Sequence, residues 1–261
     1  MLGVVQGVTE FLPVSSTAHL LLAERLLGHS DPGGVFAVTI QLGSILAVMW
    51  VYRRKLATLL GGLFSDLDAR HFAIAIVLAA IPLLLAGALL ASWVKSVLYL
   101  SPRVFAVAFI AGGIVMMLAE RIRPVPVVLD AERTSWSRAL GIGLCQTLAL
   151  IPGVSRSGAT IVGGMMVGLD RPAAAEFSFF LAMPAMVAAF AHDMIGVRHQ
   201  LSPALGLEIA VGLLTAFISS LLIIRPFLLF VRRAGFGPFA WYRIVLGGAI
   251  LAAIAGGWMD A

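Results

Sequence analysis

The sequence has few charged residues. Only 12% of its 261 residues are Asp, Glu, Lys or Arg, whereas hydrophobic residues make up 61% and the mean hydropathy is +1.03. Because soluble chains carry about 25% charged residues, this composition excludes a soluble domain. The formal net charge of +5 resides in the loops between apolar runs, where it indicates topology and contact with lipid headgroups. No nucleic-acid partner is expected.

Cysteine and the common catalytic signatures are also scarce. Cys145 is the single cysteine, which excludes an internal disulfide and a thiolate metal cluster. The sequence contains no GxxxxGK[ST], HExxH or CxxC pattern, so a P-loop, a zincin site and a dithiol site have no support. Any chemistry must therefore come from polar residues inside the apolar segments.

Long apolar runs dominate what is present. About 20 residues cross the ~30 Å hydrocarbon core as a helix, and six runs approach this length. We therefore expect an all-α integral membrane protein, a single membrane domain over residues 1–261 with six transmembrane helices. The expected spans are residues 36–52, 73–91, 104–119, 173–195, 204–224 and 239–259.

Two further segments are too short and too broken to cross a bilayer. They are QGVTEFLPVSSTAHL (6–20) and QTLALIPGVSRSGAT (146–160), and in each a proline precedes a group of hydroxyl residues. We expect a re-entrant helical hairpin in each surrounding segment, residues 1–30 and 139–170. A weak internal repeat supports their equivalence: Gly3, Gln6, Val14, Ser15 and Gly28 match Gly143, Gln146, Val154, Ser155 and Gly168, 140 positions later.

The distribution of basic residues predicts the orientation of the spans. Loops 53–72, 120–138 and 225–238 are richer in Arg and Lys than loops 92–103 and 196–203. By the positive-inside rule the first three face the cytoplasm.

This orientation makes the first hairpin enter from the outside and the second from the cytoplasm. Repeat one, about 1–120, and repeat two, about 139–261, then have opposite orientations. Such inverted-topology repeats place a shared site near the bilayer midplane.

Charged groups inside a membrane are costly and usually functional, which selects Glu10, His19 and Arg156. Serines after the prolines suit the first positions of a helix, whose N-terminus attracts phosphate. Arg156 adds a planar fork for bidentate phosphate binding. Helical spacing places His19 near Ser15 or Ser16. A serine after proline can also serve only as a helix cap, and a histidine inside a membrane can also serve only to link two helices by a hydrogen bond. These structural roles remain alternatives to a catalytic or binding role.

At these two segments the sequence resembles the bacterial undecaprenyl-diphosphate phosphatase family of the bacitracin-resistance type. The first motif, (E/Q)xxxE leading into PVSSxxH, is carried by Gln6, Glu10, Pro13, Ser15, Ser16 and His19. The second, PGxSRSxxT, is carried by Pro152, Gly153, Ser155, Arg156, Ser157 and Thr160. The resemblance extends along nearly the whole chain, including IQLGSILAV at 40–48 and EFSFFLAMP at 176–184.

The resemblance implies hydrolysis of undecaprenyl diphosphate, a membrane lipid, to undecaprenyl phosphate and phosphate, which recycles the carrier of peptidoglycan synthesis and confers bacitracin resistance. It implies the bacterial cytoplasmic membrane, a site open to the outer (periplasmic) face and a divalent cation, Mg²⁺ or Ca²⁺. A homodimer is also considered. The expected catalytic residues are Glu10, Ser16, His19 and Arg156, the substrate-binding residues Ser15, Ser155, Arg156, Ser157 and Thr160, and the metal ligands Glu10 and Gln6.

Two departures from the family pattern and several alternatives accompany this prediction. Position 6 is Gln where many members have Glu, which leaves one carboxylate, and position 18 is Ala where many have Gly. The attacking group is Ser16, His19 or water. Because inverted repeats with broken helices are typical of secondary transporters, a flippase of polyprenyl phosphate is the alternative function.

Overall fold

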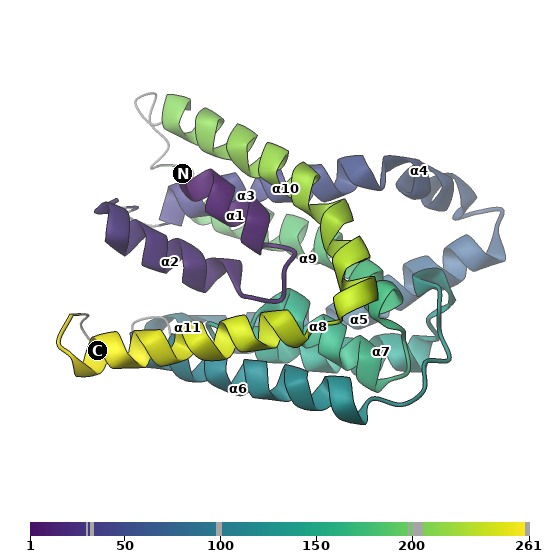
Figure 1. Cartoon of the computed structure of the whole chain (residues 1–261). Coiled ribbons are helices and arrows are strands. Elements are labelled where there is room, and N and C mark those ends of the chain that lie inside the picture. Colours follow the sequence, from purple (N-terminus) through teal and green to yellow (C-terminus); the bar gives the residue numbers. More distant parts are fainter. Residues whose placement is uncertain (30, 32–33, 98–100, 198, 200–205, 259–261) are drawn as a thin grey trace.

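The computed structural model describes residues 1–29, 31, 34–97, 101–197, 199 and 206–258, and this part of the chain is almost entirely helical (Figure 1). An isolated bridge between Val128 and Leu169 is its one piece of β-structure. The elements are α1 (Leu2–Thr9), α2 (Ser16–Leu27), α3 (Val35–Val51), α4 (Arg53–Gly62), α5 (Leu67–Val97), α6 (Pro102–Ile122), η2 (Ala131–Arg133), α7 (Trp136–Gln146), η3 (Thr147–Leu150), α8 (Arg156–Met166), α9 (Arg171–Val197), α10 (Gly206–Ala234) and α11 (Gly237–Ala255).

Several of these helices are long and apolar enough to cross a membrane. Among the described residues α5, α6, α9, α10 and α11 qualify singly, and α3 with α4 would make a sixth span, although this pair is bent by 74°. The helices therefore fit the expected multi-pass α-helical membrane protein. Their outward faces carry large exposed apolar side chains such as Leu89, Leu222 and Val245, as lipid-facing surfaces do.

Three segments expected as loops are largely helical, which corrects the sequence prediction. In the expected loop 92–103, residues 92–97 belong to α5 and residues 102–103 to α6. Residues 53–72 contain α4 and the first turn of α5, and most of residues 225–238 continue α10. Leu, Ala, Lys and Arg are good helix formers, so a run of basic residues need not end a helix. Arg232 and Arg233 occupy the last turn of α10, where positive charge favours the negative end of the helix dipole.

The segments expected to be hairpins each consist of two helices around a break. Residues 10–15 separate α1 from α2, and η3 with residues 151–155 separates α7 from α8. Pro13 and Pro152 lack the N–H that a continuous helix requires. Directly before the second helix, Ser15 and Ser155 have φ of 70° and 74°, the positive-φ non-glycine residues of the described chain. The two breaks thus share one unusual backbone conformation.

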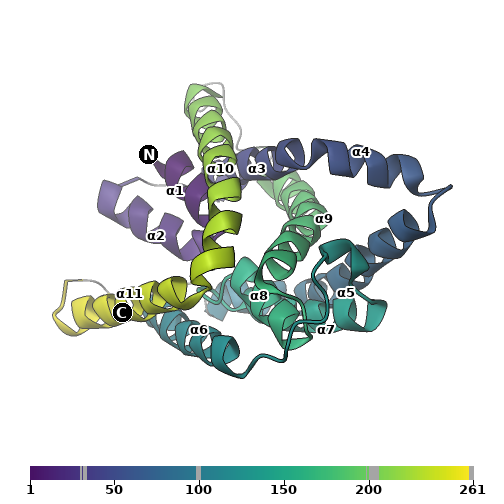
Figure 2. The same cartoon turned by 45° about the vertical axis from the view of Figure 1, so that its right-hand side comes forward.

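Close approach between helices depends on glycine at a few positions. A Cβ on Gly3 would meet the backbone of Gly212 in α10, and one on Gly143 would meet the backbone of Ala79 in α5. α1 therefore packs directly on α10 and α7 on α5. α6 and α11 run side by side (Figures 1 and 2).

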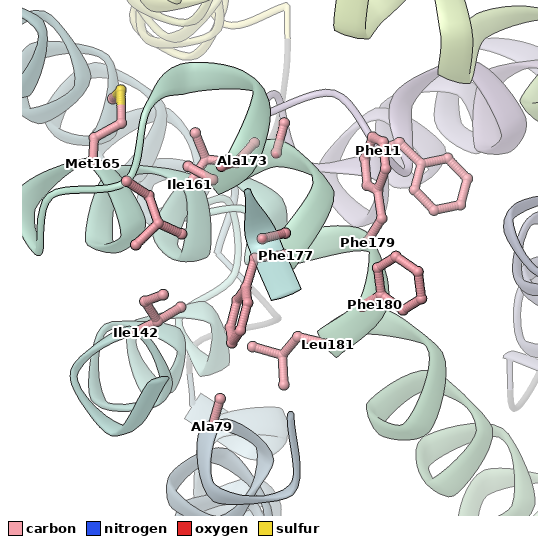
Figure 3. Close-up of a cluster of buried hydrophobic side chains, with 14 of the residues drawn as sticks. Phe11, Ala79, Ile142, Ile161, Met165, Ala173, Phe177, Phe179, Phe180 and Leu181 are labelled. Carbon is pink, nitrogen blue, oxygen red and sulfur yellow. The ribbon is translucent and has the colours of Figure 1, made fainter. Parts of the chain in front are cut away.

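Phenylalanines of α9 form the centre of the largest hydrophobic core (Figure 3). Phe177 and Phe180 pack on Phe72 of α5, and Phe179 meets Phe11 edge-on with ring centroids 5.3 Å apart. Because Phe11 directly follows Glu10, this contact fixes the first break against the core. The edge-to-face arrangement is one of the favoured aromatic geometries.

Ion pairs join several elements at one end of the helices. Lys55 Nζ of α4 lies 2.6 Å from Glu132 Oε1 of η2 and 3.0 Å from Glu176 Oε1 of α9. Glu120 of α6 accepts from Arg171 Nη2 at 2.6 Å and from the backbone N–H of Phe236 at 2.7 Å. These contacts hold together the beginnings of α4 and α9, the end of α6 and the residue that precedes α11. These elements are labelled in Figure 1.

Candidate active site at the two breaks

Glu10, at the end of α1, is the centre of the polar cluster. It is 6% exposed, and both of its carboxylate oxygens are engaged. Oε2 accepts from Gln6 Nε2 at 2.8 Å and from Ser16 Oγ at 2.6 Å, and Oε1 accepts from Arg156 Nη2 at 2.9 Å. A buried carboxylate requires such partners, so the contacts explain how Glu10 stays in an apolar interior.

Ser16 begins α2, and its hydroxyl donates to the carboxylate across the first break. The short contact of 2.6 Å is typical of a hydroxyl bonded to a charged acceptor. A carboxylate in this position can receive the hydroxyl proton and activate the oxygen as a nucleophile. Ser15 is the N-cap residue but makes no side-chain cap hydrogen bond.

Arg156 begins α8 and brings the second break to the first. The guanidinium pairs with Glu10, which lies 146 positions earlier in the chain. Its other terminal nitrogen, Nη1, is buried and has no hydrogen-bond partner within the described residues. A buried donor without a partner is costly, and a planar fork with one free arm suits a phosphate oxygen.

The hydroxyl residues of the second motif make hydrogen bonds within the protein. Ser155 Oγ caps α8 by accepting from Gly158 N at 3.1 Å. Ser157 Oγ donates to the carbonyl of Leu12 at 2.8 Å and so ties α8 to the first break. Thr160 Oγ1 lies 2.6 Å from Ser178 Oγ of α9. Ser157 and Thr160 thus face the protein interior, although the sequence motif groups them with the phosphate ligands.

His19 lies beside the cluster but is bonded elsewhere. Its Nδ1 is 2.7 Å from the carbonyl oxygen of Ser15, and its Nε2 is 2.6 Å from Tyr242 Oη of α11. Because a carbonyl only accepts, Nδ1 must carry the proton, and in the neutral ring Nε2 accepts from tyrosine. The expected neighbour was a serine hydroxyl, whereas the observed ones are a backbone oxygen and a tyrosine far along the chain.

A small pocket of about 170 Å³ opens between the two breaks. Of the residues selected from the sequence, it is lined by Glu10, Ser15, Ser16, Ser155 and Arg156. The start of α2 and the start of α8 both contribute to it, so two helix N-termini with their free N–H groups border one space. That arrangement favours an anion.

The pocket also has lining residues that the motifs did not select, among them Thr17 and Gln41. Gln41 is a polar residue in the apolar helix α3, and this isolation was the available signal. Arg243 of α11 was missed as well. It is 1% exposed and contacts the backbone of both breaks.

The site offers a metal ion two candidate ligands, the carboxylate of Glu10 and the amide of Gln6. Within the described chain no group of three or more His, Cys, Asp or Glu side chains is placed to hold an ion. Mg²⁺ commonly binds through one or two carboxylates and the phosphates of its substrate. The donor set therefore fits a cation shared with a phosphate-bearing ligand, and Glu10 and Gln6 are the residues that would hold it.

Comparison with known proteins identifies the family. A family model described as "Bacitracin resistance protein BacA" matches residues 1–249. A protein of Acinetobacter baumannii named undecaprenyl-diphosphatase is 49% identical over 254 residues, covering 97% of this chain and 93% of the relative. One of Agrobacterium fabrum, named undecaprenyl-diphosphatase 1, is 47% identical over 254 residues, covering 97% and 95%. One of Mesorhizobium japonicum with the same name is 46% identical over 247 residues, covering 95% and 92%. The chain belongs to the bacitracin resistance protein BacA family.

Proposed function

We propose that this protein hydrolyses undecaprenyl diphosphate to undecaprenyl phosphate and inorganic phosphate. The family and the names of its relatives support a phosphatase and favour hydrolysis over the flippase alternative. The observation that carries the proposal is the contact of Arg156 with Glu10 beside a pocket bordered by two helix N-termini. The product would re-enter peptidoglycan synthesis, and faster recycling would confer bacitracin resistance.

The chemistry follows from the groups that line the pocket. The terminal phosphate lies between the starts of α2 and α8, where Arg156, Ser155 and Ser15 bind its oxygens. Glu10 accepts the proton of Ser16, whose oxygen attacks the terminal phosphorus. The bond to the bridging oxygen breaks and undecaprenyl phosphate leaves. Water then cleaves the phosphoserine and releases inorganic phosphate.

The proposed role of His19 is structural, whereas its position in the motif predicts a catalytic residue. Both ring nitrogens are engaged, with the Ser15 carbonyl and with Tyr242. It therefore orients the first turn of α2, on which Ser16 lies, and Ser16 is the preferred nucleophile.

The lipid tail requires an apolar surface that continues from the polar pocket. A groove of about 650 Å³ lies along α6 and α8 and is lined mainly by apolar side chains, including Val107, Val115 and Val162. Ile151 lines both this groove and the polar pocket. The diphosphate thus occupies the small pocket while the isoprenoid chain follows the groove past Ile151.

A divalent cation, Mg²⁺ or Ca²⁺, completes the proposed site. When bound, it would neutralise charge on the phosphate oxygens. Glu10 and Gln6 would hold it, and their amide–carboxylate hydrogen bond of 2.8 Å keeps the two side chains together for this purpose.

The proposed architecture is an inverted repeat with re-entrant hairpins. Exchanging α1 with α7, α3 with α9, α5 with α10 and α6 with α11 relates several of the observed helix contacts to one another. α1 packs on α10 as α7 packs on α5, α3 packs on α10 as α9 packs on α5, and α6 packs on α11. The matching φ of Ser15 and Ser155 supports the same relation.

The proposed location is the bacterial cytoplasmic membrane. The ion pairs and hydrogen bonds of Lys55 and Glu120 join the beginning of α4, the end of α6, the beginning of α9 and the residue before α11. These parts of the chain include the arginine-rich segments and would face the cytoplasm. The site would then open to the outer, periplasmic face.

The test is phosphate release from undecaprenyl diphosphate by purified protein with Mg²⁺ or Ca²⁺. Activity in the wild type and a loss of at least ~100-fold in Glu10→Ala and Arg156→Ala, about 2.7 kcal/mol of transition-state stabilisation, would support the proposal. Rapid quenching should trap phosphoserine at Ser16. An inactive wild type that moves polyprenyl phosphate across liposomes would instead establish the flippase alternative.

A further inference from the structure

Arg243 is a buried cation inside a membrane-spanning helix. It lies in α11 and is the largest of the fully buried side chains, at 1% exposure. Within the described part of the chain its hydrogen-bond acceptors are backbone carbonyls, and no carboxylate pairs with it. Such a group is expensive to bury, so a specific use for it is expected.

The carbonyls that it binds belong to three different parts of the fold. Nη1 donates to the oxygen of Pro13 at 3.1 Å and to that of Val154 at 2.9 Å. Nη2 donates to Gly153 at 3.0 Å and to Ala108 of α6 at 3.0 Å. A single nitrogen thus bridges the first break and the second, and its neighbour links them to α6.

The surroundings leave room for a guanidinium. A Cβ on Gly112 of α6 would collide with Nη2 and would lie 2.8 Å from Cζ, and a Cβ on Gly158 of α8 would lie 3.3 Å from Nη1. The ring of Phe109 lies beneath the cation, with Cζ 5.7 Å from its centroid. Glycine on two helices therefore shapes the space that this side chain occupies.

We propose that Arg243 is a positioning residue that sets the separation of the two breaks and thereby aligns Ser16 with the phosphate held by Arg156. Val154 directly precedes Ser155 and Arg156, and Pro13 lies three residues before Ser16. Carbonyls freed by the helix breaks need donors, and five N–H donors in a rigid fork can satisfy carbonyls of both breaks at once. The inference rests on the proposed phosphatase function.

The substitution Arg243→Lys tests whether the site requires the planar guanidinium or only a positive charge. Lysine keeps the positive charge but offers one nitrogen, which cannot reproduce the two-nitrogen bridge. The diphosphate and tail would still bind, whereas the attack geometry would relax, and a misplacement of ~1 Å can cost about 100-fold in rate. We expect kcat to fall at least ~10-fold while KM changes less than ~3-fold.

A second variant reaches the same contact without altering any charged residue. Gly112 also lines the groove proposed for the lipid tail, so for Gly112→Ala the readout is kcat at saturating substrate. It should fall in the same direction, because the added Cβ displaces the guanidinium. Gly248→Ala on α11 is the matched control, because a Cβ there would meet no atom within 4 Å, and its kcat should equal that of the wild type. If Arg243→Lys protein does not fold, the kcat of the Gly112→Ala variant tests the proposal.

Thermal unfolding of each purified variant shows whether a loss of kcat comes from misaligned groups in folded protein or from unfolded protein. Folded Arg243→Lys protein with reduced kcat and near-normal KM, or folded Gly112→Ala protein with reduced kcat at saturating substrate, supports the proposal. A kcat within ~3-fold of the wild type in both, or a loss that only follows the unfolded fraction, overturns it. An inactive wild type would refute the phosphatase function itself, which is a distinct outcome.

Discussion

Arg156→Lys tests whether the site needs two guanidinium nitrogens or only a positive charge. In the structure Nη2 is committed to Glu10 at 2.9 Å, and Nη1 is buried without a partner in the described chain. Lysine can keep the ion pair or contact a phosphate oxygen, but its single nitrogen lacks the fork that does both. The substitution should therefore remove one hydrogen bond between charged groups.

A hydrogen bond to a charged group contributes about 1.5–3 kcal/mol. Since each ~1.36 kcal/mol changes a rate tenfold, kcat/KM should fall by about 10- to 150-fold. The assay is the initial rate of phosphate release from undecaprenyl diphosphate in detergent. Arg54→Lys, at an exposed position in α4, serves as the control and should be unaffected. An Arg156→Lys enzyme with kcat/KM within ~3-fold of the wild type would refute the two-nitrogen argument.

Two further predictions concern the stability of the breaks and of the helix pairs. Ser155→Ala should lower the free energy of unfolding by about 1 kcal/mol more than Ser15→Ala, because Ser155 alone of the pair accepts a cap hydrogen bond; denaturation in increasing SDS measures the difference, and equal losses would contradict it. Gly143→Ala should destabilise the protein by about 1–3 kcal/mol, because its Cβ would press on the backbone of Ala79. Gly61→Ala, whose Cβ has open space in α4, should not lower the free energy of unfolding in the same titration, and the better helix propensity of alanine should raise it by up to about 1 kcal/mol.

The meeting of the two breaks could be predicted from the sequence because isolated charges in apolar segments need partners. Glu10 and Arg156 have opposite charge and occupy equivalent broken segments, and the structure places them 2.9 Å apart. The contact of the Ser16 hydroxyl with Glu10 is predictable for the same reason. The positive φ of Ser15 and Ser155 is not, because serine has no marked preference for it.

Other features depend on contacts that a linear pattern does not contain. Helical spacing places His19 one turn from Ser15, but the group it contacts there is the carbonyl, and its second partner, Tyr242, is 223 positions away. A run of basic residues after an apolar span indicates a loop, whereas residues 53–62 form the helix α4. Charge indicates which side of the membrane a segment faces, while helix propensity decides its conformation, and the two are independent.

Arg243 shows the same limit for a residue whose partners are backbone atoms. The principle that a charge inside an apolar helix is functional applies to it as much as to Arg156, and its isolation in the span 239–259 was visible in the sequence. Its partners were not visible, because they are backbone carbonyls of Pro13, Gly153 and Val154, which every residue possesses. A side chain that binds other side chains leaves a complementary residue in the sequence, whereas one that binds the main chain leaves only its own unexplained charge. In a membrane protein an isolated arginine without an acidic counterpart should therefore direct attention to nearby breaks in the helices, where carbonyls lack donors.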